Sequence, residues 1–329
     1  MAVPRRVVTG HDAAGNAIIV SDGPPPHAFE GPTGVAAADM WSLAGPAATV
    51  DDGFEPEGGF PIEPPAGGLW WRYVRLPVPD QALPREEQFL QPHGGTPGDG
   101  QGMHSTATLD VCVILDGSIE LDTESGSTVL GPGDCVVQQG TQHRWRVLGD
   151  RPCSYLVALL SPVPGAAPSA PGPLPVVDPA AAIGPRRVVV GPGADGRSAI
   201  IADGRAPVSV PIGGDAGIVD LWHTRGPLAD VVQGGDSAPG TWDLEPGESV
   251  AWRFVQLPPS PTAHMHRTQT IDLDVLLDGE LELVLPGRQP VKLAPGDCVI
   301  QRGTEHAWRN TGDRPAQLLA VMIGVAPAP

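Results

Sequence analysis

Short apolar segments separated by turns run through the whole chain. Runs of four to eight Val, Ile, Leu and Thr residues recur, as in VCVILDG (111–117) and LDVLLDG (273–279), and Gly or Pro ends many of them. Such runs are typical of β-strands, whereas the spacing of three to four residues expected of an amphipathic helix is hard to find. The pattern predicts a mostly β protein.

The composition supports turns rather than disorder. The 329 residues include 43 Gly and 40 Pro, and 41% of the residues are hydrophobic. A high share of Gly and Pro can indicate a disordered chain, but here these residues lie between the apolar runs. The chain is also long enough for two domains, each with its own core.

The chain contains an internal duplication. The segment PRRVV occurs at 4–8 and again at 185–189, and WRYVRLP (71–77) matches WRFVQLP (252–258) at the same offset of 181 residues. Further pairs follow in the same order, namely MHSTATLD with MHRTQTID and PGDCVVQQGTQHRW with PGDCVIQRGTEHAW. Ordered matches of this kind predict two copies of one structural unit.

The changing offset divides the chain into parts. It falls from 181 to 162 residues before the MHSTATLD segment, so the first copy carries nineteen extra residues at about 79–97. Residues 161–184 are rich in Pro and Ala and predict a semi-rigid linker. We therefore expect an N-terminal half at 1–160 and a C-terminal half at 185–329.

Charge and missing motifs exclude several classes of function. The net charge of −18 argues against nucleic acid and anionic membrane surfaces as partners. Lys292 is the only lysine, and neither a phosphate-binding P-loop nor a G-x-S-x-G hydrolase motif occurs. The N-terminal residues have no apolar segment of signal-peptide length, so we expect a cytoplasmic protein.

Polar residues gather in the segment HMHRTQTIDLDVLLDGE of the second half. His264 and His266 lie two residues apart, which places both side chains on one face of a strand, about 6–7 Å apart. Asp272 follows on the same segment, and His306 comes after the later turns. On a curved barrel strand these groups could share one metal ion.

These motifs resemble the cupin superfamily. Its first motif has H-x-H, an acidic residue and a glycine, and the second half matches at His264, His266 and Gly279 but has Asp272 where cupins usually have Glu. The second motif matches fully, at Pro295, Gly296, Asp297, Gly303, His306 and Asn310. The resemblance covers both halves and implies a bicupin, with two tandem double-stranded β-helix (jelly-roll) barrels.

A narrower resemblance is to a group of uncharacterised cupins with the patterns M-H-R-T-x-[TS]-x-D and V-Q-R-G-T-x-H-A-W-x-N. The first histidine is often absent from that group, so His264 can be an addition to the site rather than its anchor. Asp272 is shorter than Glu, and it is either a metal ligand or a partner of backbone N–H groups in a turn.

The first half retains fewer of the motif residues. Gly102 stands where the second half has His264, while His104, Asp110 and His143 are retained. Two histidines and one carboxylate match the ligand count of an open iron site, or they remain from a site that has lost its function. His93, in the insertion, is a weak candidate for a further ligand. We expect the better site in the second half.

Other side chains have alternative interpretations. Arg267 and Trp308 are candidates for contacting the substrate, although an aromatic residue at this position can equally pack in the core. Arg302 and Arg309 are expected to form surface ion pairs. The four cysteines have no C-x-x-C spacing and are expected to be reduced and buried, at the positions Cys112, Cys135, Cys153 and Cys298.

Two classes of function follow. The first is an enzyme that uses one divalent transition metal (Fe, Mn, Ni or Zn), held in the C-terminal barrel, to act on a small carbonyl- or carboxylate-bearing metabolite as a dioxygenase, isomerase, cyclase or lyase. Asp272 would then be a ligand or a general base. The second is a small-molecule-binding protein without turnover, with a structural metal or none. A homodimer is a further expectation.

Overall fold

The computed structural model describes most of the chain. The described residues are 3–31, 33–56, 58–92, 95–163, 183–206, 208–213, 216–224, 246–247 and 249–325. In this part the regular structure is β-strand except for one 3-10 turn, η1 (Arg85–Gln88). The prediction of an all-β chain is therefore confirmed. No helix among these residues is long and apolar enough to span a bilayer.

The first half contributes thirteen strands. They are β1 (Arg6–His11), β2 (Ala17–Gly23), β3 (Ala28–Glu30), β4 (Ala36–Leu43), β5 (Leu69–Leu76), β6 (Thr96–Pro97), β7 (His104–Ser105), β8 (Leu109–Asp116), β9 (Ser118–Thr123), β10 (Gly126–Leu130), β11 (Cys135–Gln139), β12 (His143–Leu148) and β13 (Cys153–Leu160).

The second half repeats this series. Its described strands are β14 (Arg186–Pro192), β15 (Ser198–Arg205), β16 (Val208–Gly213), β17 (Ala216–His223), β18 (Val250–Leu257), β19 (Thr270–Asp278), β20 (Leu281–Val284), β21 (Val291–Leu293), β22 (Cys298–Arg302), β23 (Ala307–Arg309) and β24 (Ala316–Gly324).

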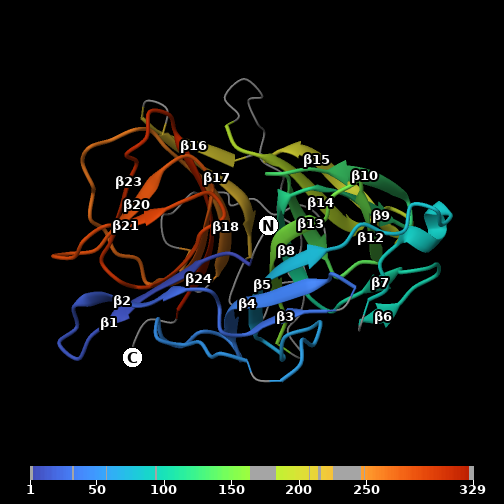
Figure 1. Cartoon of the computed structure of the whole chain (residues 1–329), viewed down its shortest axis with the longest axis horizontal. Helices are drawn as coiled ribbons and strands as arrows, with labels where there is room; N and C mark the ends of the chain where they lie inside the picture. The colour runs from blue at the N-terminus through green and yellow to red at the C-terminus, as the bar shows by residue number, and fades with distance from the viewer. Residues whose placement is uncertain are drawn as a thin grey trace.

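The strands form two barrels that lie side by side (Figure 1). One barrel pairs the eight-stranded sheet β15-β14-β11-β8-β13-β5-β4-β3 with the five-stranded sheet β10-β9-β12-β7-β6. The other pairs β16-β17-β18-β24-β19-β22-β1-β2 with β21-β20-β23. The expectation of two tandem jelly-roll barrels from an internal duplication is therefore confirmed.

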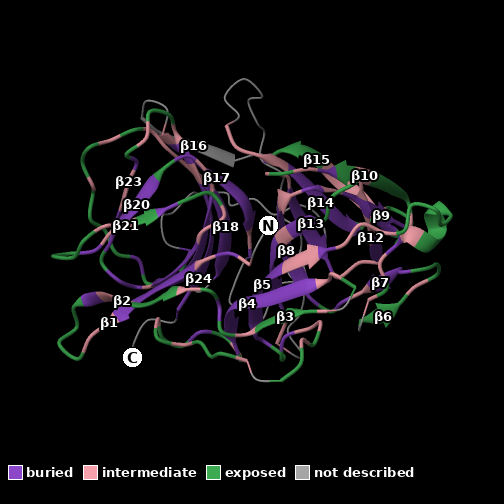
Figure 2. Cartoon of the chain, in the orientation of Figure 1, coloured by how far each residue is buried: buried purple, intermediate pink, exposed green. Residues whose placement is uncertain are grey.

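Alternation along the strands divides the core into layers. On β8, Val111 and Val113 belong to an apolar cluster that joins the two large sheets, whereas Cys112 and Ile114 face the interior of their own barrel. Because side chains alternate between the faces of a strand, both faces of the central strands are buried (Figure 2). This explains why the sequence shows continuous apolar runs.

The two halves exchange their first strands. β1 of the first half pairs in parallel with β22 of the second half, and β14 of the second half pairs in parallel with β11 of the first. The segments RRVVTG and AIIVSDG therefore lie at the edge of the opposite half's sheet (Figure 1). Each barrel thus contains strands from both halves. Of the linker predicted at 161–184, residues 164–182 lie outside the described residues.

Candidate functional site

The first pair of motif histidines meets inside the N-terminal barrel. His104 on β7 and His143 on β12 are opposite each other in an antiparallel pair, and their ring centroids lie 4.5 Å apart. Both side chains are buried. Residues that are thirty-nine positions apart in sequence are therefore side by side, because the register of two strands brings them together.

Each of these rings is held by its own backbone. His104 Nδ1 donates to the carbonyl oxygen of Gly102 at 2.9 Å, and His143 Nδ1 donates to that of Thr141 at 2.9 Å. A carbonyl oxygen only accepts, so the proton is on Nδ1 and the lone pair is on Nε2. Neither Nε2 makes a hydrogen bond to any residue that the structure describes. This arrangement orients imidazoles that ligate metals.

Burial keeps these imidazoles neutral. It lowers the pKa of His143 to about 3, with the neighbouring His104 as a second cause, and it also lowers the pKa of His104. A neutral imidazole is the form that binds a transition metal. The pair is therefore ready to accept a metal without losing a proton at neutral pH.

The second half repeats the pair with greater exposure. The rings of His266 and His306 lie 4.3 Å apart, and their Nδ1 atoms contact the carbonyl oxygens of His264 and Thr304. His306 is buried, and burial lowers its pKa to about 4. His266 and His264, however, are exposed. The pair therefore lies at the surface end of its barrel.

The two substrate candidates of the second half are also near the surface. Arg267 is exposed and lines a hollow of about 430 Å³ together with His11, His266 and Glu305. Trp308 is half-buried and packs edge-on against His306, with ring centroids 5.7 Å apart.

The candidate carboxylates lie in the barrel interiors. Thr108 Oγ1 donates to Asp110 Oδ1 at 2.6 Å, and burial raises the pKa of Asp110 to about 7. In the second half, Thr268 Oγ1 donates to Asp272 Oδ2 at 3.3 Å. Burial, and then the charge of Asp272, raises the pKa of the adjacent Asp274 well above its usual value. Asp272 thus lies beside another acid rather than in a turn.

The donor set fits a metal ion in part. Each barrel offers two imidazole Nε2 atoms on one side, which is the donor type that Fe, Mn, Ni and Zn accept. Within the described ranges, no three His, Cys, Asp or Glu side chains are close enough to hold one ion. His93 lies outside those ranges. A metal in either barrel would therefore take two histidines and complete its shell from other sources.

A cavity lies beside the first histidine pair. Its volume is about 270 Å³, and its walls carry His104, His143, Asp110, Arg72 and Gln138. The remainder is mainly apolar or aromatic, including Phe29, Phe60, Trp145 and Tyr155. Pockets for small molecules are mostly apolar with a few placed polar groups. The cavity therefore suits a small molecule with a polar end.

The insertion of the first half forms part of this cavity. We call its described residues 79–92 and 95–97 the strap. Leu90, Gln91 and Pro92 line the cavity, and Leu90 N donates to the carbonyl oxygen of Trp145 at 2.9 Å. The insertion thus forms part of the cavity wall, and the second half has no corresponding segment in its sequence.

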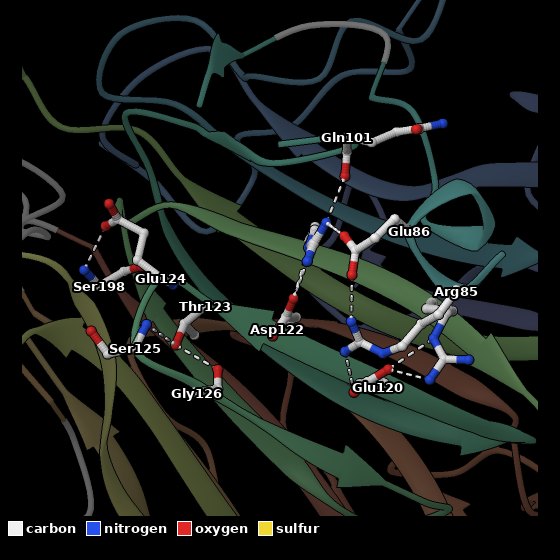
Figure 3. Close-up of polar contacts among 12 residues, drawn as sticks. Arg85, Glu86, Gln101, Glu120, Asp122, Thr123, Glu124, Ser125, Gly126 and Ser198 are labelled. Carbon is white, nitrogen blue, oxygen red and sulfur yellow. Dashed lines mark hydrogen bonds and ion pairs between the residues drawn. The ribbon is translucent and has the colours of Figure 1, made fainter. Parts of the chain in front are cut away.

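Charged side chains fasten the strap to β9 and β12. Arg85 pairs with Glu120 at 2.8 Å, and Glu86 pairs with Arg144, which also pairs with Asp122 at 2.7 Å (Figure 3). Phe89 is buried, and the guanidinium carbon of Arg144 lies over its ring, 3.8 Å from the ring centroid. Apolar contact and charge together hold the strap against the barrel.

The buried pair of Arg72 and Asp39 was not predicted from the sequence. Arg72 Nε donates to Asp39 Oδ1 at 2.6 Å, and His27 Nδ1 contacts Asp39 Oδ2 at 2.7 Å. The second half repeats the pair as Arg253 and Asp220, at 2.7 Å. The duplication carried the signal, because opposite charges recur at the same positions in two otherwise apolar strands.

The remaining predictions concern cations and thiols. Arg302 pairs with Asp51 at 3.0 Å and Arg309 pairs with Glu282, as expected of surface ion pairs. The four cysteines are free and buried, which confirms their prediction. Burial raises the pKa of Cys112, so this thiol stays protonated beside the cavity.

Comparisons with curated proteins give short matches. Residues 240–322 match the family model of the cupin domain, Cupin_2. A Diaporthe leptostromiformis protein, "Phomopsin biosynthesis cluster protein C'", is 49% identical over 65 residues, 20% of this chain and 34% of the relative. The Neurospora crassa "Cupin-domain-containing oxidoreductase srdB" is 35% identical over 79 residues, 24% of this chain and 40% of the relative. The chain spans about a third to two-fifths of the first relatives it matches.

Solved structures give broader and weaker matches. The Escherichia coli protein YlbA has a TM-score of 0.43 at 11% identity, over 77% of this chain and 76% of that protein. The salicylate 1,2-dioxygenase of Pseudaminobacter salicylatoxidans has a TM-score of 0.42 at 11% identity, over 77% and 70%. These scores are too low to support an inference about function. The match over residues 240–322 places this part of the chain in the cupin superfamily.

Proposed function

We propose that the chain is a metal-dependent enzyme that acts on a small carbonyl- or carboxylate-bearing metabolite, as an oxygenase, isomerase or lyase. The observation that carries the proposal is the N-terminal histidine pair. Both rings line one cavity, burial keeps both neutral, and both Nδ1 atoms donate to backbone carbonyl oxygens. A preorganised imidazole pair beside a ligand-sized cavity supports a working site.

The proposal favours the N-terminal barrel over the C-terminal one that the sequence motif favoured. His266 is exposed, whereas His104 and His143 are buried beside the cavity. Burial strengthens the charge interactions of these side chains. Similarity to proteins named cupin-domain-containing oxidoreductases also supports an enzyme.

The chain's own residues would divide the work. His104 and His143 would hold the metal, which supplies Lewis-acid or redox chemistry when bound. Asp110, with its pKa raised to about 7, can take or release a proton near neutral pH. Trp145 and the strap residues Leu90, Gln91 and Pro92 would pack against the substrate.

Metal content per chain tests this proposal. We would purify the wild type, a His104→Ala/His143→Ala double variant and a His266→Ala/His306→Ala double variant, and measure bound metal by mass spectrometry after reconstitution. We expect about one equivalent in the wild type, lost with the first double variant. If only the second double variant loses the metal, the metal site is in the C-terminal barrel.

A non-catalytic binding protein is the second candidate. It is favoured because no three ligand-type side chains lie close enough to hold one ion in the described ranges. Wild-type chains that bind no metal under any reconstitution, yet bind small molecules in the cavity, would support it and overturn the enzyme proposal.

A further inference from the structure

Two buried hydrogen-bond donors line the N-terminal cavity without a protein partner. Arg72 is 6% exposed and Gln138 is 3% exposed, and both side chains are cavity-lining. Arg72 Nη2 and Gln138 Nε2 make no hydrogen bond to any described residue. Buried donors are usually hydrogen-bonded, and these two face one cavity, so a ligand in that cavity can supply their acceptors.

Arg72 is fixed in place before any ligand arrives. Its Nε donates to Asp39, and its Nη1 donates to the carbonyl oxygen of Pro61 at 2.8 Å. Its guanidinium carbon lies 4.6 Å from the Trp70 ring centroid and 5.1 Å from that of Phe60. Contacts on its edge and on aromatic faces set the direction of the remaining N–H groups, so little entropy is lost on binding.

The free edge of a guanidinium favours an anionic acceptor. Carboxylates form short, charge-assisted hydrogen bonds with arginine, stronger than those of neutral carbonyl groups. Asp39 balances the charge of Arg72 but occupies only Nε, so Nη2 remains for the ligand.

The rest of the cavity sets the size and body of the ligand. A volume of about 270 Å³ lies just below the usual range of ligand pockets, about 300–1,000 Å³, so the ligand is small. The rings of Phe29, Phe60, Trp145 and Tyr155 suit a flat apolar body. Gln138 is on β11 and Arg72 is on β5, with β8 and β13 between them in the sheet. Gln138 therefore faces a different part of the ligand.

We propose that the N-terminal cavity binds a small carboxylic acid with an aromatic or similarly flat body. Arg72 Nη2 donates to the carboxylate, and Gln138 Nε2 donates to a second oxygen at another position on the ligand. This proposal rests on the proposed function, since it takes the same cavity as the working site, and it makes Arg72 a specificity-determining residue.

Equilibrium binding tests the proposal without requiring turnover. We would titrate benzoate, its neutral counterpart benzamide, and 4-hydroxybenzoate into the full-length chain by calorimetry. The variants are Arg72→Lys, which keeps a charge beside Asp39 but loses the fork of donors, and Gln138→Leu. Arg253→Lys is the matched control, because Arg253 makes the same ion pair in the other barrel.

We expect the wild type to bind benzoate at least about tenfold more tightly than benzamide, because only benzoate forms the charge-assisted bond. Arg72→Lys should remove this preference, and Arg253→Lys should retain it. Gln138→Leu should remove the advantage of 4-hydroxybenzoate over benzoate. Equal binding of benzoate and benzamide, no binding of either, or the same loss in Arg253→Lys overturns the proposal.

Two further measurements keep the outcomes separate. Thermal unfolding shows whether Arg72→Lys is folded. If it is not, the wild-type preference for benzoate and the Gln138→Leu result decide whether the proposal stands. Metal content of the same samples separates the two proposals. A carboxylate preference in chains that bind no metal would support the ligand class and overturn the metal-dependent function. Bound metal without a carboxylate preference would support the metal-dependent function and overturn the ligand class.

Discussion

Replacing Asp110 by Asn should change how the stability of the chain depends on pH. The carboxyl is 6% exposed inside the N-terminal barrel, and burial raises its pKa from 3.8 to about 7. Asn keeps the oxygen that accepts the bond from Thr108 Oγ1 but cannot ionise. The variant therefore removes the titration and retains the packing.

The sign and size of the effect follow from the two pKa values. Between about pH 4 and pH 7 the folded chain keeps a proton on Asp110 that the unfolded chain has released, so the free energy of unfolding falls as pH rises. A difference of about three pH units corresponds to at most about 4 kcal/mol. Relative to the wild type, Asp110→Asn should gain stability across this window and stay level above it.

Urea unfolding of chelator-treated wild type and variant at half-unit steps from pH 4 to pH 8 measures this difference. Asp203→Asn is the control, because the Asp203 carboxylate pairs with Arg186 and its pKa is lowered. That variant should differ from the wild type by a nearly constant amount over this range, because a lowered pKa keeps the Asp203 carboxylate ionised in the folded and the unfolded chain above about pH 4. A constant difference between Asp110→Asn and the wild type over the whole range would refute the reasoning.

Three further changes have defined outcomes. The pKa of His143 falls to about 3 on folding, so below about pH 6.5 the unfolded wild type binds a proton that the folded chain does not, and its free energy of unfolding falls as pH falls. His143→Gln lacks this titration and should gain about 1.4 kcal/mol of stability relative to the wild type for each pH unit below that point. Urea unfolding at several pH values measures this gain, and parallel stability curves for the two proteins would contradict the prediction. Phe89→Ala should cost about 3–5 kcal/mol of packing and release the strap. Limited proteolysis with mass spectrometry should then show cleavage within 79–92, and an unchanged pattern would argue against anchoring by this ring. Asp39→Asn and Asp220→Asn should each lose about 3–5 kcal/mol of unfolding free energy, since each leaves a buried arginine without its anion. A loss below about 1 kcal/mol in either would show that its pair is not needed for stability.

The sequence determined the features that local pattern and repetition encode. Apolar runs bounded by Gly and Pro gave the strand content, and the ordered repeats gave the two barrels. Motif spacing selected His104 with His143 and His266 with His306, because fixed register in paired strands brings such residues together. These outcomes depend on neighbours along the chain or directly across a strand pair.

The tertiary structure alone decided which groups are enclosed. The better motif match, at His264 and His266, lies exposed, and the less complete half contains the cavity, because the strap adds a wall that no local motif describes. Arg72 and Asp39 pair across adjacent strands inside apolar segments, so their burial could not be read from periodicity. Whether a side chain is buried depends on strands that are far apart in the sequence, whereas a motif describes only the spacing of its own residues.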